Sequence, residues 1–170
     1  MKRLKRALVI ISASTVMTMI SCSSGSKNLH KDIKGKWISI SCELRPREVR
    51  GKGGVPESFW LTREFTFDGA DNFTGLIKSY ADPECKVPVT DFYFAGHLEW
   101  KGPHAVASGA EKVDYVLDRE FSITPRATQF ADQLNQLLPG ACGAEKWVAG
   151  KTQSLLKQPC VLFNIKAGEL

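Results

Sequence analysis

Short runs in which apolar and polar residues alternate dominate the chain between residues 35 and 123. From Ser58 to Phe67, every second residue is apolar, and the one exception is Arg63. This period of two is typical of a strand with one buried face. Turn residues such as Asp68 to Asn72 (DGADN) separate the runs about every ten residues. The pattern predicts about eight antiparallel strands, the first from Gly35 to Cys42.

Glycines lie inside two of the predicted strands. Gly75 interrupts the run from Phe73 to Tyr80, and Gly96 interrupts Val89 to Trp100, which we expect to hold a fourth strand and a fifth. A glycine inside a strand is typical of a bulge or a sharp bend. We therefore predict a mainly β fold with one α-helix, in which a strongly curved antiparallel sheet forms a barrel or half-barrel.

One late segment has helical periodicity instead. Its apolar residues recur at the spacing of one helix face: Phe130, Leu134, Leu137 and Leu138. Thr124 is suited to the N-cap and Pro125 to the first helical position, and the helix should stop at Pro139-Gly140. Residues Arg47 to Pro56 (REVRGKGGVP) indicate an exposed loop, and Val161 to Ile165 a last short strand.

The N-terminus looks like the leader of an exported lipoprotein. A basic head (MKRLKR) precedes an apolar run too short to span a bilayer, and a small residue stands just before Cys22. This pattern resembles a bacterial lipobox, in which the cysteine thiol is lipidated and becomes the new N-terminus. We expect a signal peptide at residues 1–21, lipidated Cys22 with a linker at 22–34, and one domain at 35–170. Ser23 after the cysteine favours the outer membrane, facing the periplasm, by resemblance to Gram-negative sorting rules.

The net charge of the chain is much smaller once this leader is removed. The whole sequence has 23 basic and 18 acidic residues, a net charge of +5. Residues 1–21 hold four of the basic residues and no acidic ones, which leaves +1 for the remainder. The apparent basicity belongs to the leader, so we expect no nucleic-acid partner.

Four cysteines follow the predicted anchor: Cys42, Cys85, Cys142 and Cys160. An even number in an exported chain indicates disulfides, with three possible pairings. We favour Cys42–Cys85 and Cys142–Cys160, because each pair lies within one local part of the chain. A zinc site is the alternative, but the spacings match no compact ligand motif.

Catalytic motifs are not found, since the sequence has no serine elbow, phosphate loop or HExxH. His97 and His104 flank a proline turn and give only a weak indication of a metal site. We therefore expect a protein that is not an enzyme and has no metal or cofactor.

The aromatic content of the strands is the strongest sign of a ligand. The pocket candidates share the apolar parity of the predicted strands: Phe59, Leu61, Arg63, Phe65, Phe67, Phe92, Phe94 and Trp100. They either fill the interior of a barrel or line a pocket for an acyl chain or another hydrophobe. Arg63 needs a partner on such a face, and Glu43 or Glu84 is suited to supply it. Its role is then either a structural salt bridge or ligand binding.

Three motifs together resemble a known family. They read W-x-S-x-x-C-E-x-R-P from Trp37, F-x-L-T-R-x-F-x-F from Phe59, and Y-x-D-P-x-C from Tyr80. They are similar to the APC-down-regulated (APCDD) domain, known from membrane-tethered animal inhibitors of Wnt signalling. The likeness covers most of Ile33 to Ile165. It implies a barrel-like domain with a hydrophobic cavity that accepts a lipid.

These observations predict a lipoprotein of the cell envelope, held in the membrane through Cys22, whose domain binds a lipid or another hydrophobic molecule. The alternative is a structural or interaction module with a filled barrel that docks on envelope proteins.

Overall fold

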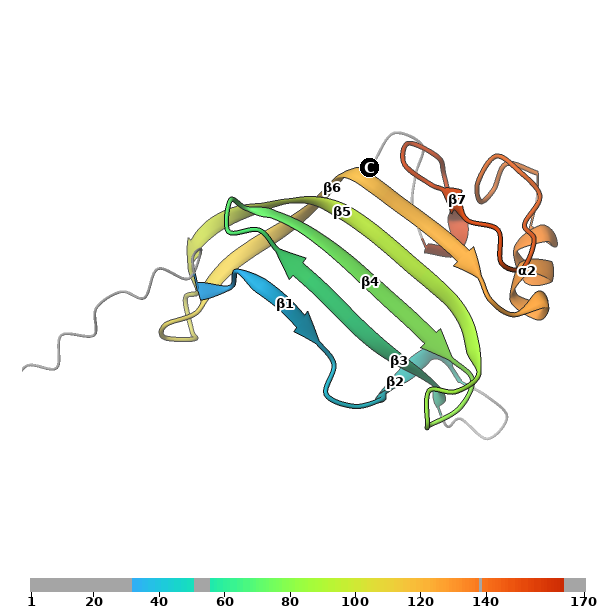
Figure 1. Ribbon diagram of the computed structural model, residues 1–170, viewed down its shortest axis with the longest axis horizontal. Coiled ribbons are helices and arrows are strands. Elements are labelled where there is room, and N and C mark those ends of the chain that lie inside the picture. Colours follow the sequence, from blue (N-terminus) through green and yellow to red (C-terminus); the bar gives the residue numbers. More distant parts are fainter. Residues whose placement is uncertain (1–31, 51–55, 138, 164–170) are drawn as a thin grey trace, which may run out of the picture.

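The computed structural model describes residues 32–50, 56–137 and 139–163. They form a sheet with a small C-terminal unit at one end, made of the described residues after β6, 126–137 and 139–163 (Figure 1). The elements, in chain order, are β1 (Gly35–Ile38), β2 (Glu43–Arg50), β3 (Pro56–Phe67), β4 (Asn72–Tyr80), β5 (Pro88–Pro103), β6 (Glu111–Pro125), α2 (Thr128–Asn135), β7 (Gln153–Ser154) and the 3-10 helix η1 (Val161–Phe163). Within these ranges, no helix is long and apolar enough to cross a membrane.

The seven strands form one antiparallel sheet. They follow the order β1-β3-β4-β5-β6-β7. Strand β2 pairs with the same edge of β3 as β1 does, and residues 39–42, which are not in a strand, separate the two. The described strands form no pairing between the β1/β2 edge and β7, so this sheet is open. The predicted mainly β class with one α-helix is confirmed. The sheet formed by these strands neither closes nor curls strongly, so the predicted barrel is not confirmed.

The two glycines inside strands have different roles. Gly96 lies in a register shift, where Ala95 is opposite Glu120 but His97 is opposite Val116, so the predicted bulge is present there. Gly75 lies in unbroken register between Phe65 and Phe94, and the bulge predicted there is wrong. A Cβ at Gly75 would lie 2.1 Å from the Phe94 ring, so this glycine makes room for an aromatic side chain.

Several predicted boundaries near the N-terminal edge are also wrong. The first strand ends at Ile38, and Ile38 and Ile40 are exposed rather than half-buried. Arg47 to Arg50 belong to β2 instead of an exposed loop, while residues 51–55 lie outside the described residues. Strands predicted as separate elements merge into the long strands β5 and β6.

The helix begins later than its sequence signals indicated. Thr124 and Pro125 are the last residues of β6, where they lie opposite Asp91 and Thr90 of β5. Helix α2 has Ala127 as its N-cap and makes no side-chain capping hydrogen bond. Residues 161–163, predicted as strand, form η1. Pairing with a neighbouring strand therefore outweighed the local Thr-Pro signal.

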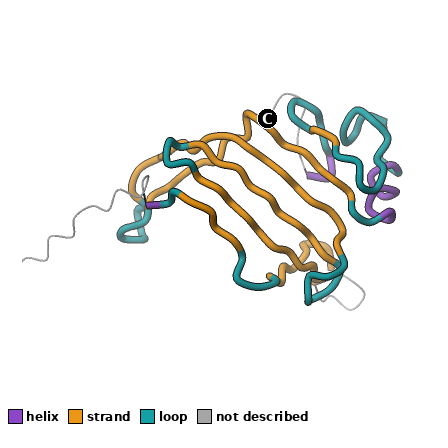
Figure 2. The backbone as a smooth tube through the Cα atoms, in the orientation of Figure 1, coloured by secondary structure: helices purple, strands orange, loops and turns teal. Residues whose placement is uncertain are grey.

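The C-terminal unit lies next to the end of β6 (Figure 2). Together with Phe121 and Ile123 of β6, it forms a buried hydrophobic cluster. Trp147 is 2% exposed, and its indole Nε1 donates to the carbonyl of Cys142 at 2.9 Å. Asn135 bonds both the N–H and the carbonyl of Trp147, each at 2.8 Å. Ile123 of β6 and Leu155 are fully buried beside it. The segment after α2 thus folds back and covers one end of the sheet.

Candidate binding face on the sheet

Strand register places most of the aromatic residues of the sheet on one face. Directly opposite residues in antiparallel strands point to the same side. One row across the sheet is Phe65, Gly75, Phe94 and Phe121, and the next is Arg63, Ile77, Phe92 and Ile123. We call this side the aromatic face. All eight predicted pocket candidates lie on it by strand parity.

Most of the ring pairs on the aromatic face meet edge to face. The centroids of Phe73 and Tyr115 are 4.9 Å apart, and those of Phe65 and Phe94 are 5.7 Å apart. Phe65 also packs against Tyr115 and Phe67. Such pairs contribute about 0.5–1.5 kcal/mol beyond their buried area. Even so, Phe65, Phe67 and Phe94 are only half-buried, and Tyr115 is exposed.

Two hollows lie on this face. One, of about 890 Å³, lies between the sheet and the C-terminal unit, and its walls include Phe59, Thr90, Phe92, Phe130 and Phe163. The other, of about 580 Å³, lies over the middle of the sheet and is lined by Arg63, Phe65, Ile77, Phe92, Phe94, Tyr115, Leu117 and Phe121. Phe92 belongs to both walls, so the hollows adjoin. Their sizes lie in the range of small-molecule sites.

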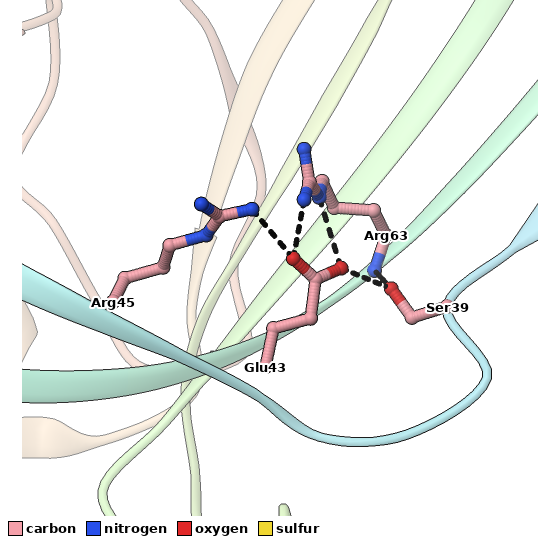
Figure 3. Close-up of polar contacts among 4 residues, drawn as sticks. All are labelled: Ser39, Glu43, Arg45 and Arg63. Atoms are coloured by element: carbon pink, nitrogen blue, oxygen red, sulfur yellow. Dashed lines mark hydrogen bonds and ion pairs between the residues drawn. The ribbon is translucent and has the colours of Figure 1, made fainter.

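Arg63 is held beside the second hollow by a polar network (Figure 3). Its Nε donates to Glu43 Oε1 at 3.0 Å, and its Nη2 donates to Glu43 Oε2. Ser39 Oγ donates to Glu43 Oε1 at 2.6 Å and accepts the backbone N–H of Arg63 at 2.8 Å. Arg45 Nη2 adds a further bond to Glu43 Oε2 at 2.7 Å. Of the two partners that the sequence offered, Glu43 is the one that pairs with Arg63.

The network sets the charge state of its members. Hydrogen bonds from Arg63 and then Ser39 lower the pKa of Glu43 from its usual 4.5 to about 2. The same bond raises the pKa of Arg63. Elsewhere on this face, burial raises the pKa of the Tyr115 hydroxyl. The Glu43 carboxylate and the Arg63 guanidinium are therefore charged at neutral pH.

The structure distributes the other predicted pocket residues around these hollows. Leu61 is buried, and Phe67 stacks on Phe65 and lies at a tilt beside Phe73. Trp100 donates from Nε1 to Asp71 Oδ1 at 2.8 Å. None of these three lines either hollow. Sequence reasoning missed further lining residues: Ile77, Tyr115, Leu117, Phe121, Phe130 and Phe163. Strand parity alone could have identified Tyr115, but η1 and α2 required the tertiary fold.

Both favoured disulfides are present. Cys42 bonds Cys85, which fastens the outer edge of the sheet to the turn after β4, and Cys142 bonds Cys160 within the C-terminal unit. Cys22, the predicted anchor, lies outside the described residues.

The two histidines have separate partners. His97 Nδ1 lies 3.0 Å from Asp118 Oδ2, and His104 Nδ1 accepts the N–H of Val106 at 3.3 Å. Over residues 32–50, 56–137 and 139–163, no group of three potential metal ligands is found.

Apolar side chains are also exposed along the outer edge of the sheet. Trp37, Ile38, Ile40 and Leu44 are all exposed there. They come from β1, from the break after it and from β2, which pair with one edge of β3.

The chain matches the model of a known protein family. Residues 15–166 fit the model of the family described as adenomatosis polyposis coli down-regulated 1 (APCDDC). The match covers most of the chain, which therefore belongs to this family.

Proposed function

We propose that this family member binds a lipid or another elongated hydrophobic molecule on its aromatic face. The observation that carries the proposal is the pair of adjoining hollows, about 890 and 580 Å³, on a face whose rings are left half-buried. In this proposal the sheet and the C-terminal unit act together as a half-barrel around the ligand. The protein acts as a binding module, not as an enzyme.

The energetic case rests on the apolar surface that a ligand would cover. Each Å² of apolar surface removed from water contributes roughly 25 cal/mol. Phe65, Phe94 and Tyr115 present rings that no other described element covers completely. An acyl chain lying along them would bury both its own surface and theirs, without moving the sheet.

We also propose that the protein is a lipoprotein of the cell envelope, anchored through Cys22 and most simply placed at the outer membrane facing the periplasm. The support is the lipobox-like leader. More than one acyl chain is needed for stable anchoring. Expression of the full chain with labelled palmitate, beside Cys22→Ala, tests this. Label that stays on the Cys22→Ala protein would contradict the anchor.

Ligand binding is tested by native mass spectrometry of the full chain purified from its envelope, followed by lipid extraction. We expect a co-purifying lipid, and rebinding of a long-chain hydrophobe after delipidation. An apo mass that is unchanged after incubation with fatty acids, fatty alcohols and phospholipids would contradict the proposal.

Matched variants locate the site. Leu117→Ser changes a wall of the smaller hollow, and we expect it to weaken binding. Val106→Ser replaces an apolar residue that is exposed outside both hollows, and we expect it to bind as the unmodified chain does. Equal binding by the two variants would move the site away from the aromatic face.

The exposed edge residues favour a second candidate, an interaction module that docks on envelope proteins. Trp37, Ile38, Ile40 and Leu44 give this edge an apolar surface suited to a protein partner. Cross-linking in envelopes, compared between the unmodified chain and Ile40→Ser, distinguishes this candidate. A partner lost only in the variant, together with no lipid binding, would favour it over the lipid site.

A further inference from the structure

We propose that Arg63 binds the head group of the ligand, and that the ligand class is a long-chain carboxylate. This inference rests on the proposed hydrophobe-binding function and adds the polarity of the ligand. Among the described residues that line the two hollows, Arg63 carries the only charge. An uncharged hydrophobe would leave that guanidinium facing an apolar surface.

The geometry leaves part of the guanidinium available. Glu43 takes the N–H groups of Nε and Nη2, and no described residue bonds Nη1. Figure 3 shows the third nitrogen of Arg63 pointing away from the carboxylate. Arginine side chains lose considerable rotamer freedom when they are fixed. Here Glu43 and Ser39 hold the group in place, so its free N–H donors are oriented before a ligand arrives.

The charge of the network favours an anion. Arg63 and Arg45 both bond the single carboxylate of Glu43, which leaves one net positive charge. A carboxylate would neutralise this charge and accept hydrogen bonds from Nη1, a strong pairing for guanidinium donors. A phosphate dianion would instead leave an excess negative charge next to the rings.

The row structure of the sheet says where the chain of such a ligand would lie. Arg63, Ile77 and Phe92 form one row across the aromatic face, and Phe92 is the wall common to both hollows. A carboxylate at Arg63 places its alkyl chain over Phe65 and Phe94 in the smaller hollow, with Phe92 leading into the larger one.

The test compares two probes that differ only in the head group, dodecanoate and dodecanol, on the delipidated full chain. We expect the unmodified protein to bind dodecanoate about tenfold or more tightly than dodecanol, since hydrogen bonds to charged groups are the stronger ones. Arg63→Met should abolish this preference, because dodecanoate loses far more affinity than dodecanol. Arg63→Lys should retain part of it.

A second variant keeps the test decisive if Arg63→Met does not fold. Arg45→Met leaves the Arg63–Glu43 pair in place but removes one positive charge, and we expect the preference for dodecanoate to fall several-fold. Added salt should reduce the preference in the unmodified protein as well. Equal affinity of the unmodified chain for both probes would overturn the head-group role alone. Binding of neither probe would overturn the proposed function with it.

Discussion

At the end of the sheet next to α2, the aromatic face is closed by the C-terminal unit, whereas around Phe65 and Tyr115 the same face is open. Ile123 at the closed end is fully buried, and Tyr115 on the same strand, β6, is exposed. Both regions are apolar, so composition does not distinguish them. Coverage does distinguish them, because the described residues after β6 fold back over the end of the sheet next to α2 and leave the region around Tyr115 uncovered.

This difference separates two uses of apolar side chains. At the closed end they are packed against Trp147 and Leu155, which supplies stability. At the open end part of their surface stays in contact with water, and that surface is available to a ligand. Substitutions at the closed end should therefore act mainly on folding, and substitutions at the open end mainly on binding.

The largest effect is expected at the closed end, from Trp147→Ala. Removal of a buried tryptophan costs about 3–5 kcal/mol of unfolding free energy, and here the Nε1 bond to Cys142 is lost as well. Phe65→Ala, at the open end, should cost only about 1–2 kcal/mol because its ring is half-buried. Urea denaturation measures both. Equal losses would contradict the division between the two ends.

Next is removal of the disulfide within the closed end. Replacing Cys142 and Cys160 with serine opens a loop with a sequence separation of 18, which in the chain-entropy model costs about 3 kcal/mol. We expect the larger hollow, whose wall includes Phe163 just after Cys160, to lose ligand affinity. The control is the reduced and reoxidised unmodified protein. Full stability of the double variant would show that packing alone holds this unit.

A smaller loss of stability is expected from substituting the two strand glycines, and it should differ between them. Gly75→Ala places a Cβ against the tip of the Phe94 ring, which can turn into the open hollow, so we expect a cost of about 1–2 kcal/mol and weaker hydrophobe binding. Gly96→Ala instead places its Cβ 1.7 Å from the backbone oxygen of Val116, which cannot move without the strand. Its cost should be about 2–3 kcal/mol, the upper part of the range for overpacked sites. Thermal unfolding with dodecanol titration distinguishes the two, and the reverse order would contradict this account.

Much of the aromatic face could be predicted from sequence, because parity along a strand fixes which side a residue faces. The alternation around Phe65 was therefore predicted correctly. Both disulfide pairs were predicted on another ground, because each pair lies within one local part of the chain. Parity does not reveal which other element covers a face, so the coverage by α2 and η1 was missed. Parity also does not show whether the two outer strands of a sheet pair with each other, so the sequence pattern could not predict barrel closure.

The boundary errors have a related cause. The Thr124-Pro125 start signal is local, but Thr124 and Pro125 are paired with β5, and this contact comes from residues more than thirty positions earlier. Likewise Ile40 fits the alternation of apolar residues, yet it lies between β1 and β2, outside any strand, and its side chain is exposed. Local sequence signals failed where the secondary structure or the burial of a residue depended on whether a distant strand packs against it.

The smallest expected effect concerns the charged network at the border of the open end. The pKa of Glu43 is lowered to about 2, so its ionised form stabilises the folded state above the unfolded value of 4.5, and this contribution is lost as the pH falls towards 2. Because Glu43, Arg63 and Arg45 remain partly solvated, we expect only about 1 kcal/mol. Glu43→Gln should therefore be less stable than the unmodified chain near neutral pH, and the gap should narrow in acid.

Urea denaturation across this pH range measures the gap, and Glu64→Gln provides the control. Glu64 pairs with Lys36 at 2.7 Å, and its alternation with Arg63 places it on the opposite face of β3. Both partners are well exposed, so its removal should change stability little at any pH. A gap for Glu43→Gln that stays constant down to pH 2 would mean that packing, not charge, accounts for its effect. In that case the orientation of Arg63 towards the smaller hollow would not depend on the ionised carboxylate.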